Sequence, residues 1–357
     1  MILAGPPQPE NFQIEVIMPT SASAPVTPER ILQLAWGFAP PLVLEAAIRH
    51  RIFDVLNEGP RTLQEIQAET GVSERGLSAI VNFLVGFDFL AKDGDGKFSL
   101  APESAEFLVS TKPNFQGGML RHVTSLLLPA WLEINDVVAT GKPAVPVNQQ
   151  GPGSEFFQEL VNDIFPLSYS VAQQLAEHLE LPASQAPVSV LDLAAGSGVW
   201  GIALAECSRQ VHVTAVDWPA VIPVTRAMVA RFGLADRFSY REGDLLKTDF
   251  GTGYTIATLG HILHSEGAAR SQALLNQTFQ ALASGGTIVI AEFLVNADRT
   301  GPISGLTFAV NMLINTDCGD TFSFEEIGSW LKDAGFVNAR TLATHGGPSP
   351  LILATRP

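Results

Sequence analysis

A turn of small residues followed by two aspartates has the residue types and spacing that could bind a nucleoside. The apolar run 188–193 ends in Ala194-Ala195-Gly196-Ser197-Gly198 and leads directly into a helical stretch. Small residues in such a turn let the backbone approach a ligand closely at the carboxyl end of a strand. Asp217 ends the next apolar run, where a carboxylate can accept hydrogen bonds from both hydroxyls of a ribose. Asp244 follows one helix later and is placed to reach an adenine edge, although each acid alone could be a plain turn residue.

A histidine and a glutamate form the second candidate group. His264 follows the expected strand 255–259 and Glu292 follows the expected strand 287–291, so both fall at the carboxyl edge of one sheet. A neutral imidazole can take a proton from an attacking hydroxyl, and a carboxylate on its other ring nitrogen fixes the tautomer and stabilises the imidazolium. The pair therefore predicts general-base chemistry on a hydroxyl. The alternative is a structural histidine that packs beside the sheet.

These side chains meet only if a parallel sheet brings them together, and the C-terminal half of the chain predicts one. Short β-rich runs alternate with helical stretches from residue 186 onward. Strands that alternate with helices form a parallel sheet covered on both faces. We therefore expect a Rossmann-like α/β domain over residues 186–357, with a doubly wound, mostly parallel sheet. The expected strands are 188–193, 211–216, 255–259 and 287–291.

The N-terminal half predicts a mostly helical architecture. Residues 1–27 are rich in Pro, Ser, Ala and Thr and predict a flexible arm. Residues 28–110 contain several helical stretches, one of which opens on the capping-box pattern Thr62-Leu63-Gln64-Glu65. A hairpin pattern around Asp93-Gly94-Asp95-Gly96 follows them, so this segment predicts a winged-helix domain. Residues 111–185 predict a helical linker.

The turn, the ordered acids and the His–Glu pair, preceded by a winged helix, resemble one enzyme family. The chain is similar to the S-adenosylmethionine-dependent small-molecule O-methyltransferases with an N-terminal winged-helix dimerisation domain, from about residue 28 to the C-terminus. The resemblance implies a class I methyltransferase fold, a homodimer, S-adenosylmethionine as cofactor, S-adenosylhomocysteine as product and a role in secondary metabolism. It implies that His264 is the general base and that Glu292 orients it. The cofactor-binding residues that it implies are Asp192, Ala194, Gly196, Gly198, Asp217, Trp218, Asp244 and Leu245.

The same resemblance places the acceptor pocket on helices of residues 111–185 and on the segment 308–315. Large apolar and amide side chains there would suit a flat aromatic or polyketide-like molecule better than an anion. The alternative is that most of these aromatic residues belong to the core. The candidate substrate-binding residues are Phe157, Asn162, Phe165, Met312 and Asn315.

Several positions depart from the family pattern. Ala194 replaces the first of three glycines, and Ser265 stands where an aspartate usually follows the catalytic histidine. Thr321, next to Asp320, stands at the place of a second orienting glutamate, and Gly260 replaces a lysine or polar residue under the adenine. These departures leave open N- or C-methylation, or a reaction without methyl transfer, on the same fold and cofactor.

Charge and hydropathy disfavour other classes of protein. The 357 residues carry 21 Lys+Arg against 36 Asp+Glu, a formal charge of −15, so we expect neither nucleic acid nor an anionic membrane as a partner. A winged-helix regulator is the alternative, but residues 29–110 hold 7 Lys+Arg against 12 Asp+Glu and the would-be recognition helix 73–90 is mostly apolar. Apolar runs such as 125–131 fall well short of a membrane span, and no signal-peptide pattern opens the chain. These features predict a cytoplasmic protein.

We expect no bound metal. His261 and His264 are three residues apart and could share a helical face as ligands, but the sequence lacks the clustered acids of metal-dependent methyltransferases. Cys207 and Cys318 are too few for a zinc cluster or a disulfide framework, and they suit a reducing compartment.

Overall fold

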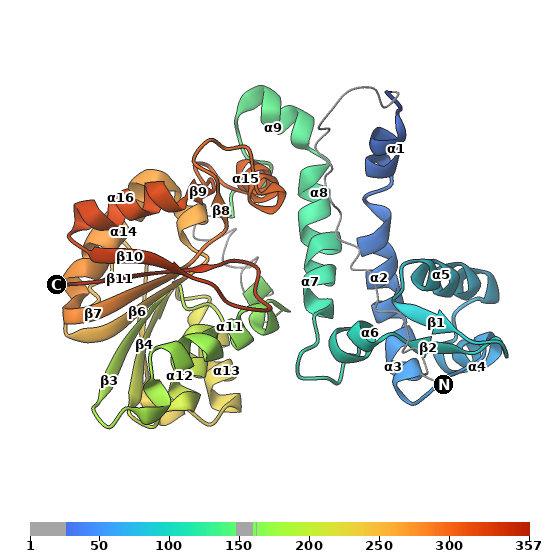
Figure 1. Cartoon of the computed structure of the whole chain (residues 1–357), viewed down its shortest axis with the longest axis horizontal. Helices are drawn as coiled ribbons and strands as arrows, with labels where there is room; N and C mark the ends of the chain where they lie inside the picture. The colour runs from blue at the N-terminus through green and yellow to red at the C-terminus, as the bar shows by residue number, and fades with distance from the viewer. Residues whose placement is uncertain (1–25, 148–159, 162) are drawn as a thin grey trace, which may run out of the picture. The chain divides into compact units, whose positions relative to one another are not determined.

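The computed structural model describes residues 26–147, 160–161 and 163–357 (Figure 1). The chain divides into two units, Met1–Ala39 and Pro40–Pro357. In the first unit, helix α1 (Glu29–Ala35) has no buried residue. Trp36 and Phe38 follow it and stack on each other, with ring centroids 5.9 Å apart. The large apolar side chains that the described part of this unit exposes are Val26, Ile31, Leu32, Leu34, Trp36 and Phe38.

The helical segment Glu29–Arg49 is long and apolar enough to cross a membrane, judged by length and composition alone. By this criterion, the expectation that the longest apolar runs fall well short of a membrane span is wrong for this segment. A turn at 36–38 interrupts it before helix α2 (Ala39–Arg49), whose first turn holds Pro40 and Pro41. Proline is tolerated there because its missing N–H has no partner in a first turn. An apolar helix that associates with a second chain has the same appearance, so length and composition do not make this segment a membrane span.

The expected helices and hairpin are present at the start of the second unit. Thr62 and Glu65 form the reciprocal capping box at the start of α4, because each side chain accepts a hydrogen bond from the other residue's backbone N–H. Strands β1 and β2 pair antiparallel, with Leu90 opposite Leu100. The elements are α3 (Ile52–Asn57), α4 (Leu63–Thr70), α5 (Glu74–Gly86), β1 (Leu90–Lys92), β2 (Phe98–Leu100) and α6 (Pro102–Phe107). Their core includes Phe53, Leu56, Ile66, Leu77, Val81, Leu84 and Phe98.

The next stretch is mostly helical, as predicted for the linker. A π-helical turn, Val123–Leu127, connects two α-helices without interrupting the run. Trp131 at the end of this run donates a hydrogen bond from Nε1 to Asn311 Oδ1 at 2.9 Å. The helices are α7 (Gly117–His122), α8 (Leu128–Trp131), α9 (Ile134–Thr140) and α11 (Phe165–His178).

A seven-stranded sheet forms the centre of the C-terminal half, in the order β10-β11-β7-β6-β3-β4-β5. The five strands from β7 to β5 are parallel, while β11 pairs antiparallel with both β7 and β10. Three of these strands, β5, β10 and β11, are additional to the four that the sequence analysis named. The strands are β3 (Val188–Leu193), β4 (Val211–Asp217), β5 (Phe238–Glu242), β6 (Tyr254–Gly260), β7 (Leu282–Ala291), β10 (Val337–Leu342) and β11 (Leu351–Thr355).

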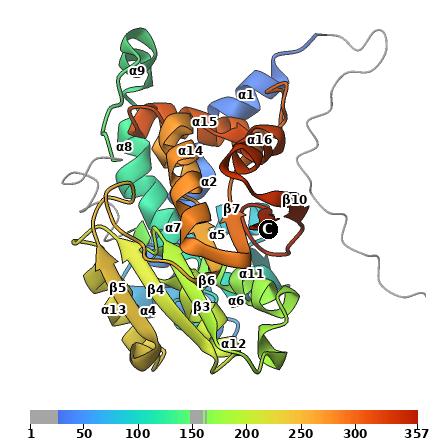
Figure 2. The same ribbon diagram turned by 90° about the vertical axis from the view of Figure 1, so that its left-hand side faces the viewer.

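Helices cover both faces of the sheet (Figure 2). One apolar cluster joins α11 and α12 to side chains such as Val190 and Val213. A second joins α14 and α16 to Leu191 and Leu193, the neighbours of Val190 along the same strand. Successive strand residues point to opposite faces, so both faces of β3 are buried, which explains its continuous apolar run. The helices are α12 (Val199–Cys207), α13 (Ile222–Arg231), α14 (Leu263–Ala281), α15 (Ile303–Asn315) and α16 (Phe324–Ala334).

The turn after β3 bends back on itself through three residues with positive φ. Gly196 (φ 56°) and Gly198 (φ 79°) adopt this conformation freely, but Ala194 (φ 54°) also lies in the left-handed region. The methyl group of an L residue crowds the backbone there, at a cost of roughly 1–2 kcal/mol. The alanine in the first glycine position therefore leaves the turn in place but strains it.

Replacing Ala194 should relieve this strain. We expect Ala194→Gly to raise the free energy of unfolding by about 0.5–1 kcal/mol, because the steric relief outweighs the extra chain entropy that glycine loses. The matched control is Ala195→Gly. Ala195 is the next residue in the chain and is buried, but its φ is not positive. That change should lower the free energy of unfolding. Urea denaturation without added cofactor measures both, and a loss of stability in Ala194→Gly would contradict the strain.

Candidate active site

The carboxyl ends of five parallel strands present the candidate residues in the order of the sheet. Asp244 follows β5, Asp217 ends β4, the small-residue turn follows β3, His264 follows β6 and Glu292 follows β7. Parallel strands end at the same edge, so residues as far apart as 194 and 292 in the chain become neighbours.

Asp217 holds the small-residue turn against the end of β4. Its Oδ2 accepts a hydrogen bond from the Gly196 N–H at 2.7 Å, and its Oδ1 accepts one from the Trp218 N–H at 2.7 Å. Burial raises the pKa of Asp217 to about 6, although these two N–H groups act in the opposite direction. Each oxygen still has acceptor capacity for a further donor.

Asp192 lies beneath the same turn and is fully buried. Its carboxylate accepts hydrogen bonds from the Gly201 N–H at 3.1 Å and the Thr258 hydroxyl at 2.7 Å, which ties β3 to α12 and β6. Burial raises its pKa to about 7. The structure thus shows Asp192 joining three elements around the end of β3, while its direct contact with a cofactor stays a prediction.

Asp244 belongs to a chain of charges that reaches the helix of the candidate base. Its Oδ1 accepts hydrogen bonds from the Leu246 N–H at 2.9 Å and from Arg270 Nη2 at 3.2 Å. Arg270 also donates from Nε to Glu266 Oε2 at 2.5 Å, and Glu266 lies two residues after His264 on α14. Arg270 is therefore a functional candidate that the sequence analysis missed, because its partners become neighbours only in the folded chain. Leu245 is buried beside Asp244.

His264 and Glu292 form the buried pair that their spacing predicts. His264 Nδ1 lies 2.6 Å from Glu292 Oε1, and the His264 backbone N–H donates to Oε2 at 3.1 Å. The Phe293 N–H also donates to Oε1, at 2.9 Å. Burial raises the pKa of Glu292, but His264 and the other donors outweigh it, so its pKa lies below the usual value. One carboxylate thus fixes both the ring and the backbone of His264, and leaves Nε2 as the ring nitrogen available to a substrate.

Aromatic rings surround the imidazole. Phe308 of α15 meets the His264 ring edge-on, with centroids 4.8 Å apart. Phe308 stacks on Phe293 at 3.9 Å, and Phe293 lies 5.9 Å from His264 and 5.0 Å from His261. The base therefore lies in an apolar, aromatic environment that suits an uncharged acceptor.

The position of the expected second glutamate is filled differently. Thr321 is buried and its hydroxyl donates to the Gly305 carbonyl at 3.3 Å. The neighbouring Asp320 contacts His264 through its backbone, since its N–H donates to the His264 carbonyl at 2.9 Å, while its carboxylate pairs with Arg299 at 3.3 Å. Among the described residues, Glu292 is therefore the carboxylate that orients the imidazole.

Gly260 has a packing reason that its sequence context did not reveal. A Cβ at this position would lie 2.0 Å from Nε1 of Trp200, which is in the first turn of α12. Trp200 is buried and occupies the space that a larger side chain at position 260 would need. The two residues are 60 positions apart, so only the folded structure shows that Trp200 requires a glycine at position 260.

The candidate acceptor residues divide into three cases. Met312 and Asn315 are buried on α15, where Asn315 Nδ2 donates to the Asn311 carbonyl at 2.9 Å. Phe165 packs in the core, with its ring centroid 5.2 Å from Tyr169, as the core alternative predicts. Phe157 and Asn162 lie outside the described residues.

The His261 alternative for a metal site gains no support from the described part of the chain. His261 Nε2 lies 2.8 Å from the Ser349 hydroxyl, and burial lowers its pKa to about 4. Within residues 26–147, 160–161 and 163–357, no group of three or more His, Cys, Asp or Glu residues could hold a metal ion. The expectation of a metal-free site stays a prediction.

Two protein-family models match the chain. Residues 146–337 match the O-methyltransferase domain, and residues 32–110 match the O-methyltransferase dimerisation domain. The chain belongs to the S-adenosylmethionine-dependent O-methyltransferase family. This confirms the predicted family, the enzyme class and the fold class, a helical dimerisation domain followed by a mixed, mostly parallel α/β methyltransferase domain.

Individual relatives cover nearly the whole chain. It is 28% identical over 324 residues to 3-hydroxy-5-methyl-1-naphthoate 3-O-methyltransferase of Streptomyces sahachiroi, which covers 88% of this chain and 91% of that protein. It is 27% identical over 335 residues to the tetracenomycin polyketide synthesis 8-O-methyltransferase TcmO of Streptomyces glaucescens, which covers 92% and 97%. The structure of human N-acetylserotonin methyltransferase in complex with S-adenosylmethionine shares the fold, with a TM-score of 0.80 at 21% identity over 94% of this chain and 99% of that one.

Proposed function

We propose that this O-methyltransferase moves the methyl group of S-adenosylmethionine to a hydroxyl of a flat, uncharged aromatic or polyketide-like molecule, with His264 as general base and Glu292 as its orienting partner. The observation that carries the proposal is the buried 2.6 Å contact between His264 Nδ1 and Glu292 Oε1, at the same sheet edge as the small-residue turn. The named relatives that act on a hydroxynaphthoate and in tetracenomycin synthesis support an aromatic acceptor.

The residues at the ends of β3, β4 and β5 fit S-adenosylmethionine. Asp217 has acceptor capacity for two ribose hydroxyls, and Oδ2 of Asp244 is not used by Arg270 or Leu246. Gly196 and Gly198 allow the backbone to approach the ligand closely. When bound, the cofactor supplies a methyl group on a positively charged sulfur, which leaves as a neutral thioether.

His264 supplies what the acceptor needs. A hydroxyl is a weak nucleophile until it loses its proton, and Nε2 can take that proton while the oxygen forms its bond to the methyl carbon. The imidazole becomes a cation, and Glu292, which stays ionised, stabilises that charge at Nδ1. Phe293 and Phe308 exclude water from the ring and strengthen this interaction.

N- or C-methylation is the alternative that the departures from the family pattern leave open. The N,N-dimethyltransferase OxyT of Streptomyces rimosus and the L-tyrosine C(3)-methyltransferase of Streptomyces lavendulae are 24% and 25% identical to this chain. The His264–Glu292 pair favours a phenolic acceptor, because a phenol must lose its proton to attack through its oxygen or through its ring carbon. Mass spectrometry and NMR of the methylated product distinguish the three outcomes.

The first test concerns the cofactor. Asp217→Ala should weaken S-adenosylhomocysteine binding by about 1.5–3 kcal/mol, the scale of hydrogen bonds to a charged group. The pKa of Asp217 is raised to about 6, and its ionised form is the better hydrogen-bond acceptor. The affinity of the parent protein should therefore rise between pH 5 and pH 7, about one unit below and above this pKa, and then level off. Asp217→Ala should lose this rise. Calorimetry measures the affinity and its pH dependence, and Asp236→Ala, at an exposed position, is the control. Unchanged affinity in a folded Asp217→Ala variant would disprove the role of Asp217 in cofactor binding.

The second test concerns the base. His264→Ala should lower kcat for a neutral phenolic acceptor by about 10²–10⁴, the usual contribution of a positioned base, and leave cofactor affinity unchanged. Glu292→Gln should cost less, and the double variant should be no slower than His264→Ala, because the two residues act as one unit. Activity of His264→Ala should partly recover at high pH. The exposed His212→Ala is the control, and identical pH–rate profiles of His264→Ala and the parent would show that His264 is structural.

We also propose that the chain is a homodimer that buries the exposed apolar side chains of residues 31–38. Two observations support this proposal: residues 32–110 match the dimerisation domain, and α1 has no buried residue. Light scattering at micromolar concentration should give twice the chain mass of 38.1 kDa. Ile31→Glu combined with Leu34→Glu should shift the equilibrium toward monomer, because a charge is costly to bury, whereas Gln33→Glu should not. A monomeric parent would contradict the proposal.

A further inference from the structure

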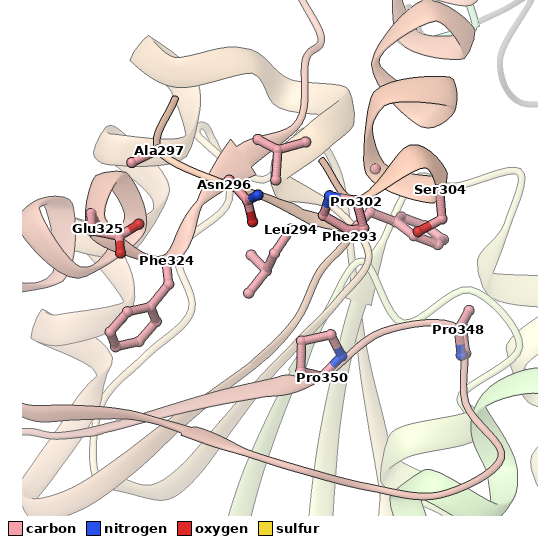
Figure 3. Close-up of a pocket in the computed structure, with 12 residues that line it drawn as sticks. Phe293, Leu294, Asn296, Ala297, Pro302, Ser304, Phe324, Glu325, Pro348 and Pro350 are labelled. Atoms are coloured by element: carbon pink, nitrogen blue, oxygen red, sulfur yellow. The ribbon is translucent and has the colours of Figure 1, made fainter. Parts of the chain in front are cut away.

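A cavity of about 400 Å³ lies beyond Glu292 at the same edge of the sheet (Figure 3). Its walls come from the segment that leaves β7, which includes β8 (Leu294–Val295), from the first turns of α15 and α16, and from the segment that enters β11. In Figure 3 Leu294 lies in the middle of the lining residues, with Phe324 on one side, Phe293 on the other and Pro350 below. No candidate cofactor residue lines it.

Apolar side chains and polar groups share the lining. Aromatic and aliphatic side chains and three prolines form most of it, while Asn296, Ser304 and Glu325 are exposed at the mouth. Among the described residues that line the cavity, none has a cationic side chain, and Glu325 has the one carboxylate. An anionic ligand would meet no compensating charge and a negative carboxylate, so the occupant must be uncharged or weakly cationic.

The cavity has a fixed wall. Ser349, between the lining residues Pro348 and Pro350, is buried and lies 2.8 Å from His261 Nε2. Gln174 of α11 holds the same segment from the other end, because its amide donates to the His345 carbonyl at 2.9 Å and accepts from the His345 N–H at 3.0 Å. A wall held by such contacts is a formed site rather than a loose surface loop.

The order of strands places the cavity on the far side of the base from the candidate cofactor residues. The candidate cofactor residues follow β5, β4 and β3; His264 follows β6, Glu292 follows β7, and the cavity lies at the end of β7 and the start of β11. The cofactor site and the cavity therefore lie on opposite sides of His264 along one edge. An acceptor that reaches His264 and extends away from the cofactor is directed toward the cavity.

Phe293 connects the base to the cavity. Phe293 is a lining residue of the cavity, and its ring stacks on Phe308 at 3.9 Å and lies 5.9 Å from the His264 ring. On α15 the lining residue Ser304 is four residues before Phe308, and Phe308 is four residues before Met312, so all three lie along one side of the helix. The same helix side thus runs from the cavity past the base to a candidate acceptor residue.

We propose that this cavity is a distal subsite of the acceptor site and holds the far rings of a flat, uncharged polycyclic aromatic substrate whose hydroxyl lies at His264. This rests on the proposed function and deepens it, because it predicts the size of the acceptor. Phe293 and Phe308 offer ring faces on which fused rings stack. A single-ring phenol reaches His264 without entering the cavity, whereas a three-ring acceptor gains its binding energy there.

The test fills the cavity from its rim and compares acceptors of different length. Ser304 is exposed on the first turn of α15, and Ser304→Phe introduces a ring among Phe293, Pro302 and the opposite wall. We measure kcat/KM for a monocyclic phenol, 2-naphthol and a hydroxylated anthracene, following S-adenosylhomocysteine release. In Ser304→Phe the ratio of kcat/KM for the anthracene over the phenol should fall at least tenfold, through a rise in KM.

The matched control is Thr307→Phe, which adds the same ring one turn further along α15 at an exposed position that does not line the cavity. It should keep the parent's ratio within twofold. If Ser304→Phe does not fold, Asn296→Trp blocks the cavity from another wall and should give the same tenfold fall.

Two failures are distinguishable. If the parent methylates phenols and naphthols and both cavity-filling variants keep its acceptor ratio, the distal subsite is wrong while the proposed function stands. If the parent binds S-adenosylhomocysteine but methylates no hydroxyl of any acceptor, the proposed function fails, and the subsite proposal fails with it.

Discussion

One buried carboxylate organises the catalytic end of this protein. Glu292 has no solvent exposure and accepts hydrogen bonds from the His264 ring, the His264 backbone and the Phe293 backbone. A buried charge is costly unless donors surround it, so the contacts that neutralise Glu292 also fix the start of α14 and the segment that leaves β7. The orientation of the candidate base and the position of the Phe293 backbone both depend on this one residue.

The cofactor side depends on a similar arrangement. Asp217 holds the small-residue turn from the adjacent strand, Asp192 ties β3 to α12 and β6, and burial raises the pKa of both. Asp244 is joined through Arg270 to α14, the helix that begins beside His264. The three acids are partly or fully buried, and each is satisfied by hydrogen bonds from neighbouring groups, which offsets the cost of burial.

The departures from the family pattern are compensated within the fold. Trp200 occupies the space left by Gly260, and the Asp320 backbone contacts the His264 carbonyl where a second glutamate is expected. Ala194 keeps the left-handed conformation of the glycine that it replaces. The changes at 260 and 321 are explained by neighbours that are distant in sequence, whereas Ala194 keeps its place at the cost of strain. They support an enzyme that keeps the family's site with a single orienting carboxylate and a more apolar environment.

The sequence by itself determined the family, the parallel sheet and the His264–Glu292 pair, because apolar strands that end in turn residues place those residues at one edge whatever the details of packing. It did not reveal β5, β10 and β11, and it left open whether Phe165 belongs to the core or to the acceptor pocket. Only the tertiary structure decided that Arg270 joins Asp244 to α14, that Trp200 fills the space at Gly260, and that a cavity follows Glu292. These features depend on side chains that come from different elements, and their distances are set by packing rather than by any local pattern.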